Sequence, residues 1–304
     1  YLTDGAGMTL TTATADEDSM IVSPHSVAKQ SAWDDMLWGT ENEVIWEAQI
    51  RTDAIDNQDV WAGLKLTNTE VAITDIDSAY FTYGTAAEFF QSLSTNDNTA
   101  MALDGTGMGW HFIYAINDVF YTTNLGLDVV ADTTYHLKIV IDSDRKISAY
   151  INGTQYGLVN DSGHGDNISN AGTANGTWGE TNTIVNGTSG GSTSTTELTL
   201  VVDGTDARTT FKPGDYVHVA DTAVPIGRVK SVTALAIVLE SLDATVANDV
   251  ELFNYGQTAY SATEKSKALT NGINLKPFIA IQATGAAAEI LHVHWQAISR
   301  KISE

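Results

Sequence analysis

Apolar and polar residues alternate with a period of two along most of the chain, which is the pattern of β-strands with one buried face. In residues 44–51, for example, Trp46 lies on the apolar side and Glu47 on the polar side. Similar patterns predict strands over residues 60–66, 79–83, 110–114, 135–141, 147–151, 278–281 and 290–298. Helical periodicity is nearly absent, so we expect an all-β protein.

Turn residues and composition predict how these strands are grouped. Asn152-Gly153 favours a tight hairpin turn after the strand at 147–151, which we expect to pair with the strand at 135–141. Gly, Ser, Thr and Asn dominate from about residue 160 to 194, which predicts a loop or linker. Short alternating segments then follow up to residue 253 and indicate a small barrel of about five strands.

The strands after residue 268 resemble those of the first part of the chain, so we interpret the barrel as an insertion. The predicted organisation is a sandwich body over residues 1–192, an inserted small β-barrel domain over 193–255, and closing strands of the body over 256–304.

Four segments together resemble the concanavalin-like lectin/glucanase superfamily. They are WAGLKL at 61–66, YHLKIVID at 135–142, ISAYING at 147–153 and LKPFIAIQ at 275–282. The resemblance implies a concanavalin-like jelly-roll sandwich of two antiparallel sheets, here with the inserted barrel. This fold hosts lectins, hydrolases, lyases and structural modules, so it does not by itself imply a function.

Two catalytic motifs of that superfamily are incomplete or absent. The glycosidase pattern Glu-x-Asp-x-x-Glu does not occur, and the nearest pair, Glu43 and Glu47, is interpreted as two outward residues of one strand. The lyase pattern Gln-Ile-His is replaced by Gln49-Ile50-Arg51, which leaves no histidine to abstract a proton. We therefore expect no catalytic residue and no enzymatic activity.

Few residues suggest a metal site. The chain has no cysteine, which excludes thiolate ligands. Asp53, Asp56 and Asp59 are candidate calcium ligands, because calcium prefers several oxygen ligands, although Asp is also common in turns. His292 and His294 have the spacing of two ligands on one strand, but no third ligand is evident nearby. We expect no cofactor apart from this calcium candidate.

Aromatic residues are the candidates for contacts with a glycan or another surface. Trp61, Trp110 and Trp178 are selected for this role, Trp178 because it lies in the polar stretch around residues 160–194. By contrast, Trp46 lies on the apolar side of its strand and is expected in the core.

Charge narrows the choice of partners. The net charge is −23, with 38 Asp and Glu against 15 Lys and Arg, which disfavours nucleic acid and anionic lipid. No apolar stretch reaches the roughly 18 residues of a membrane span.

The composition of the chain, rich in Thr, Gly and Asn, poor in Lys and without Cys, resembles that of phage virion proteins. The turn Lys212–Val217 in the predicted barrel resembles small inserts in structural proteins of tailed phages. This resemblance implies a non-enzymatic virion structural protein, a capsid decoration or fibre-like protein on the particle surface. The expected partners are the major capsid protein or other virion proteins, further copies of the chain in a homo-oligomer, and a host-surface glycan. The alternative is a soluble carbohydrate-binding lectin module or a divergent polysaccharide hydrolase or lyase.

Overall fold

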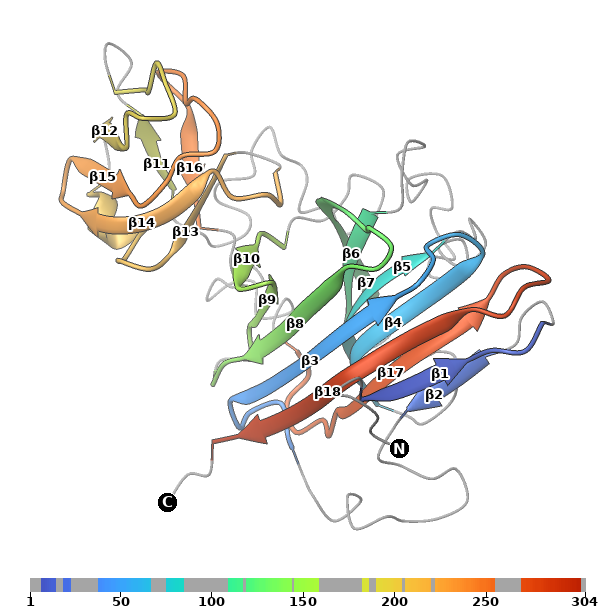
Figure 1. The fold of residues 1–304 in the computed structure, drawn as a ribbon. Helices are drawn as coiled ribbons and strands as arrows, with labels where there is room; N and C mark the ends of the chain where they lie inside the picture. Colours follow the sequence, from blue (N-terminus) through green and yellow to red (C-terminus); the bar gives the residue numbers. More distant parts are fainter. Residues whose placement is uncertain are drawn as a thin grey trace.

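The computed structural model describes residues 7–14, 19–22, 38–66, 75–84, 109–116, 119–143, 145–158, 182–185, 190–203, 206–219, 222–254 and 269–301. Nearly all regular structure in these ranges is β-strand (Figure 1). The one helix among them is the three-residue 3₁₀-helix η3 (Ala207–Thr209). In this part of the chain no helix has the length and hydropathy of a membrane span.

Two six-stranded antiparallel sheets form a sandwich, which confirms the predicted fold class. Sheet A has the order β1 (Met8–Thr11), β18 (Ile290–Arg300), β3 (Val44–Thr52), β8 (Thr134–Ile141), β9 (Ile147–Ile151) and β10 (Thr154–Tyr156). Sheet B has the order β2 (Ser19–Val22), β17 (Lys276–Ala283), β4 (Gln58–Lys65), β5 (Ser78–Gly84), β6 (Gly109–Ile116) and β7 (Val119–Asp128). The predicted pairing of residues 135–141 with 147–151 is present, with Ile141 opposite Ile147.

The apolar sides of the two sheets face each other and form the main core. Trp46 of β3 is fully buried there, as the alternation predicts. On sheet B, Phe81 contacts Phe112 edge to face with ring centroids 4.9 Å apart, and Trp110 contacts Tyr83 in the same way at 5.0 Å. Aromatic pairs of this geometry add to the stabilisation that burial alone provides.

A closed barrel lies between β10 and β17 in the sequence. Its strands follow the order β11 (Asn182–Val185), β12 (Thr199–Asp203), β15 (Ala236–Leu239), β14 (Gly227–Val232), β13 (Tyr216–Val219) and β16 (Glu251–Phe253). β11 falls in the segment that composition predicted as a linker and precedes residue 193, the predicted first residue of the barrel. Polar neighbours concealed this four-residue strand, which pairs with both β12 and β16.

The two sheets differ in how far their outer faces are exposed. Every residue of β4 is buried, including those that point away from the main core. In β3, by contrast, buried residues alternate with partly exposed ones over the whole strand. The outer face of sheet A is therefore partly exposed along β3 and accessible to a ligand.

Two buried histidines make the fold sensitive to acid. Burial lowers the pKa of His111 to about 4 and that of His218 to about 4. An unfolded histidine titrates near 6.5, so each imidazole stabilises the folded state fully above about pH 6.5 and loses this contribution as pH falls toward 4. Each histidine is expected to add about 1.4 kcal/mol per pH unit to the slope of unfolding free energy in this window.

Urea unfolding of the wild type and of His111→Asn and His218→Asn at several pH values between 4.5 and 7 checks this expectation. Each variant should have a shallower pH slope than the wild type. Equal slopes in all proteins would contradict the assignment.

Candidate functional site

The outer face of sheet A consists of the outward-pointing residues of β18, β3, β8 and β9. A β-bulge between Val293 and Trp295 shifts the register of β18, so that Trp295 lies opposite Gln49. The residues of this face are Ile290, His292, Trp295, Ala297 and Ser299 of β18, Ile45, Glu47, Gln49 and Arg51 of β3, Thr134, His136, Lys138 and Val140 of β8, and Ser148 and Tyr150 of β9.

The centre of this face is a cluster of interacting polar and aromatic side chains. Glu47 lies between two cationic or basic groups, with its Oε1 3.3 Å from Lys138 Nζ and 3.6 Å from His136 Nε2. His136 lies directly opposite Gln49, and its ring is 5.3 Å from that of Trp295. Trp295 Nε1 donates to Gln49 Oε1 at 3.2 Å. These contacts fix a histidine, an amide and an indole side by side at an accessible surface.

Tyr150 extends the cluster onto β9. It lies opposite Lys138, whose Nζ is 5.9 Å from the centre of the phenol ring. Burial raises the pKa of Tyr150, and the neighbouring Tyr216 and Asp215 raise it further, against a hydrogen bond with Ser148 that lowers it. The phenol therefore stays protonated at neutral pH and can act as a proton donor.

At one end of the face, Arg51 is held by two carboxylates. Its Nη2 lies 2.9 Å from Asp53 Oδ1 and its Nη1 lies 3.6 Å from Asp132 Oδ1. His292 Nε2 lies 2.9 Å from the same oxygen of Asp53, and His292 Nδ1 is 3.2 Å from Thr9 Oγ1. Both nitrogens of His292 thus have partners within the protein, and Asp53 orients two side chains of the face.

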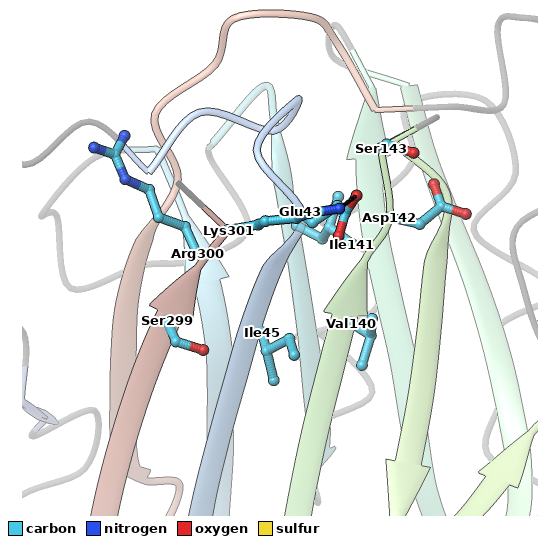
Figure 2. Close-up of a pocket in the computed structure, with 9 residues that line it drawn as sticks. All are labelled: Glu43, Ile45, Val140, Ile141, Asp142, Ser143, Ser299, Arg300 and Lys301. Carbon is cyan, nitrogen blue, oxygen red and sulfur yellow. Dashed lines mark hydrogen bonds and ion pairs between the residues drawn. The ribbon is translucent and has the colours of Figure 1, made fainter. Parts of the chain in front are cut away.

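A depression of about 430 Å³ lies at the opposite end of the face. Figure 2 shows Ile45, Val140 and Ser299 side by side on three strands, with Glu43 and Lys301 beyond the strand ends. The depression is lined by Glu43, Ile45, Val140, Ile141, Asp142, Ser143, Ser299, Arg300 and Lys301.

The carboxylates of this depression already have partners. Glu43 Oε1 lies 2.9 Å from Lys301 Nζ, and Asp142 Oδ1 accepts a hydrogen bond from the backbone N–H of Lys146 at 2.9 Å. Glu47 lies on β3, but Glu43 precedes the strand with a φ of 49°, so the two are not outward residues of one strand as the sequence analysis expected. The depression therefore does not contain a free pair of carboxylates for catalysis.

The centre of the outer face carries fewer carboxylates than the chain as a whole. Among the residues that define this face, Glu47 is the single carboxylate, whereas Arg51 and Lys138 are cations. Asp53 and Asp132, beside the face, pair with Arg51, and Glu47 pairs with Lys138, so neighbouring carboxylates balance both cations. On a chain whose net charge is −23, Arg51 and Lys138 are still the groups of this face that can donate to an anionic ligand.

The structure does not gather the three calcium candidates into one cluster. Asp53 is paired with Arg51 and His292, Asp56 is exposed, and Asp59 is buried on β4 of the other sheet. In the ranges that the structure describes, no group of three or more His, Asp or Glu is arranged to hold a metal ion. Calcium binding and assembly into a homo-oligomer stay predictions.

The aromatic candidates from the sequence do not lie on the open face. Trp110 is 1% exposed in the main core, and Trp61 is 2% exposed on β4, so neither side chain offers a surface for a ligand. Trp178 lies outside the described residues. Among the tryptophans that the structure describes, Trp295 is the accessible one, at 40% exposed. The sequence analysis missed it because the bulge in β18 reverses the side that simple alternation assigns to it.

No family model and no curated protein matches the chain. Among solved structures, the chain is similar to a variant of alginate lyase A1-II′, with 8% identity over 99% of this chain and 82% of that chain, at a TM-score of 0.36. It is also similar to the alginate lyase of Alteromonas sp. 272, with 8% identity over 96% of this chain and 88% of that chain, at a TM-score of 0.29. A third match is the beta-glucanase of Bacillus licheniformis, with 12% identity over 83% and 66% of the two chains, at a TM-score of 0.23.

These proteins are jelly-roll sandwiches of the concanavalin-like fold, and the likeness concerns the fold alone. The comparisons contradict the prediction of a non-enzymatic virion structural protein, because the matching structures are polysaccharide lyases and a glucanase. The motif argument behind that prediction considered residues along one strand, whereas the sheet register places His136 of β8 directly opposite Gln49.

Proposed function

We propose that the protein binds an acidic polysaccharide on the outer face of sheet A and cleaves it by β-elimination. The observation that carries this proposal is the central cluster, in which His136, Gln49, Lys138 and Tyr150 share an accessible face of an acidic protein. Several of the matching structures are alginate lyases, so alginate is the first substrate to test.

β-Elimination on a uronate residue requires three functions. A base removes the proton from the carbon next to the carboxylate, a donor stabilises the charge that develops on that carboxylate, and an acid protonates the leaving glycosidic oxygen. The bond from the ring carbon to that oxygen breaks as a carbon–carbon double bond forms, so the product is an unsaturated uronate.

Residues of the central cluster match these functions. His136 is the proposed base, because histidine is the side chain that most often serves as a general base and because it lies beside a neutral donor, Gln49. Gln49 and Arg51, two residues apart on β3, are the proposed donors to the carboxylate. Tyr150 is the proposed acid, since its raised pKa keeps it protonated.

The test is a screen of the purified chain against alginate, pectate, laminarin and agarose. Formation of an unsaturated uronate is followed by ultraviolet absorbance, and binding is followed by affinity electrophoresis. Absorbance that rises with alginate or pectate alone supports the proposal. Reducing ends released from laminarin without unsaturated product would indicate a hydrolase, and retention of a polysaccharide without any cleavage would indicate a lectin module.

Substitutions of the ion pair at the centre of the face should change binding in opposite directions. Lys138→Gln removes a cation and should weaken binding of an acidic polysaccharide about tenfold, or about 1.4 kcal/mol. Glu47→Gln removes the single carboxylate of the face and should strengthen binding. Lys230→Gln, which removes a charge from an exposed position of the barrel, is the matched control. Affinity electrophoresis at low and high salt measures all three, and equal shifts for Lys138→Gln and Lys230→Gln would contradict the assigned face.

A further inference from the structure

The barrel lies against the edge of sheet A at which the central cluster ends. In Figure 1, β9 and β10 are the strands of the sandwich that lie next to the barrel. Tyr216 Oη donates to the carbonyl oxygen of Gly153 at 2.9 Å, and the N–H of Gly157 donates to the carbonyl oxygen of Ala223 at 2.8 Å. Ala223 and Phe253 belong to the main core cluster of the sandwich. These contacts fix this side of the barrel beside the β9–β10 hairpin.

The barrel carries an aromatic and a cationic side chain at this junction. Tyr216 of β13 lies opposite Arg228 of β14, whose guanidinium carbon is 5.9 Å from the centre of the Tyr216 ring. Arg228 Nε donates to the carbonyl oxygen of Gly214 at 3.1 Å, and its Nη1 lies 3.6 Å from Glu240 Oε2. The Arg228 side chain remains about half exposed.

Tyr150 connects this pair to the outer face of sheet A. Tyr216 Oη donates to the carbonyl oxygen of Gly153, in the turn that follows the strand of Tyr150, and Tyr216 and Asp215 both raise the pKa of Tyr150. Asp215 is itself held by the backbone N–H of Lys212 at 2.8 Å and by Asn254 Nδ2 at 3.1 Å. Aromatic side chains therefore follow one another from Tyr150 on sheet A to Tyr216 on the barrel.

The resulting path crosses several strands of sheet A. It begins at Trp295 on β18, passes His136 on β8 and Tyr150 on β9, and reaches Tyr216 and Arg228 on the barrel. From β18 to β9 it covers three strand spacings, or roughly 14 Å. A path of this length, lined by aromatic rings and ending at a cation, suits an extended chain with several sugar units more than a single sugar.

We propose that Tyr216 and Arg228 of the barrel form an outer subsite for the acidic polysaccharide, beyond the central cluster on sheet A. This inference rests on the proposed function and adds the barrel to the binding site. An aromatic ring supplies an apolar surface for a sugar ring, and a half-exposed guanidinium forms paired hydrogen bonds with a carboxylate. The barrel thereby selects for longer chains and does not take part in the bond cleavage itself.

The test uses the full chain with short and long alginate oligosaccharides, and their affinities are measured by isothermal titration calorimetry. Arg228→Gln and Tyr216→Ala should each weaken binding of the long oligosaccharides about tenfold and leave binding of disaccharides unchanged. Arg208→Gln is the matched control, because Arg208 is an exposed barrel arginine that pairs locally with Asp206. Circular dichroism of each variant checks that the fold is retained.

The outcomes separate this inference from the proposed function. If the wild type binds long oligosaccharides and Arg228→Gln binds them equally well, the barrel subsite is wrong while the central site stands. If the wild type binds no alginate or pectate of any length, both proposals are overturned. Equal losses in Arg208→Gln and Arg228→Gln would show a general charge effect and would also overturn the subsite.

Discussion

Replacement of His136 by glutamine is expected to reduce the rate of polysaccharide cleavage roughly 100- to 10,000-fold, the range typical for loss of a general base. Glutamine retains a hydrogen-bonding side chain of similar reach but cannot take the proton from the uronate carbon. Because Gln49, Lys138 and Tyr150 remain in place, binding of the polysaccharide should change by less than about threefold, a difference of under 1 kcal/mol. Initial rates of ultraviolet absorbance and affinity electrophoresis measure the two effects separately.

The control for this prediction is His294→Gln. His294 lies on β18 beside Trp295, but the bulge excludes it from the position opposite Gln49. This variant should keep the wild-type rate. The assignment of His136 as the base fails if His136→Gln cleaves at the wild-type rate, or if both variants lose activity equally.

Truncation of Trp46 to alanine is expected to destabilise the fold by about 3–5 kcal/mol, as for other large aromatic residues removed from a core. Trp46 has no exposed surface and lies in the main core, opposite Ile139 of β8 and Ile298 of β18. Its loss leaves a cavity between the two sheets that neighbouring strands cannot fill without breaking their register. Since small domains are stable by only about 5–15 kcal/mol, such a loss should be evident in urea unfolding followed by circular dichroism.

Trp295→Ala is the matched control for this truncation. Its side chain is 40% exposed and packs beside His136 on the surface. The expected loss of stability is below about 1 kcal/mol, as for most surface substitutions. The account of the core would be contradicted if the two tryptophan variants unfolded at the same urea concentration.

The strands of the sandwich were predictable because alternation directly reflects which side chains are buried. In β3, the apolar positions that contain Trp46 are the buried ones, and Glu47, Gln49 and Arg51 are the partly exposed ones. Alternation cannot reveal that β4 is buried on both faces, so Trp61 was selected as a surface residue although it is 2% exposed. What covers the second face of a strand depends on distant parts of the chain, which a local pattern does not contain.

The site was less predictable than the fold, because it is assembled from several strands. His136 and Gln49 are far apart in the sequence, and only the antiparallel register of β3 and β8 brings them opposite each other. The position of Trp295 depends on a β-bulge, and no residue type in β18 predicts that bulge. The glutamine of the incomplete motif was a local signal, but a motif along one strand contains no information on which residues of neighbouring strands lie opposite it.

The most direct test of the central claim is the ultraviolet absorbance of alginate and pectate during incubation with the wild-type chain. The account predicts that absorbance rises as unsaturated uronate ends form, and that this rise is lost in His136→Gln while binding persists. If the wild type binds these polysaccharides but forms no unsaturated product, or if it neither binds nor cleaves them, the central claim is contradicted.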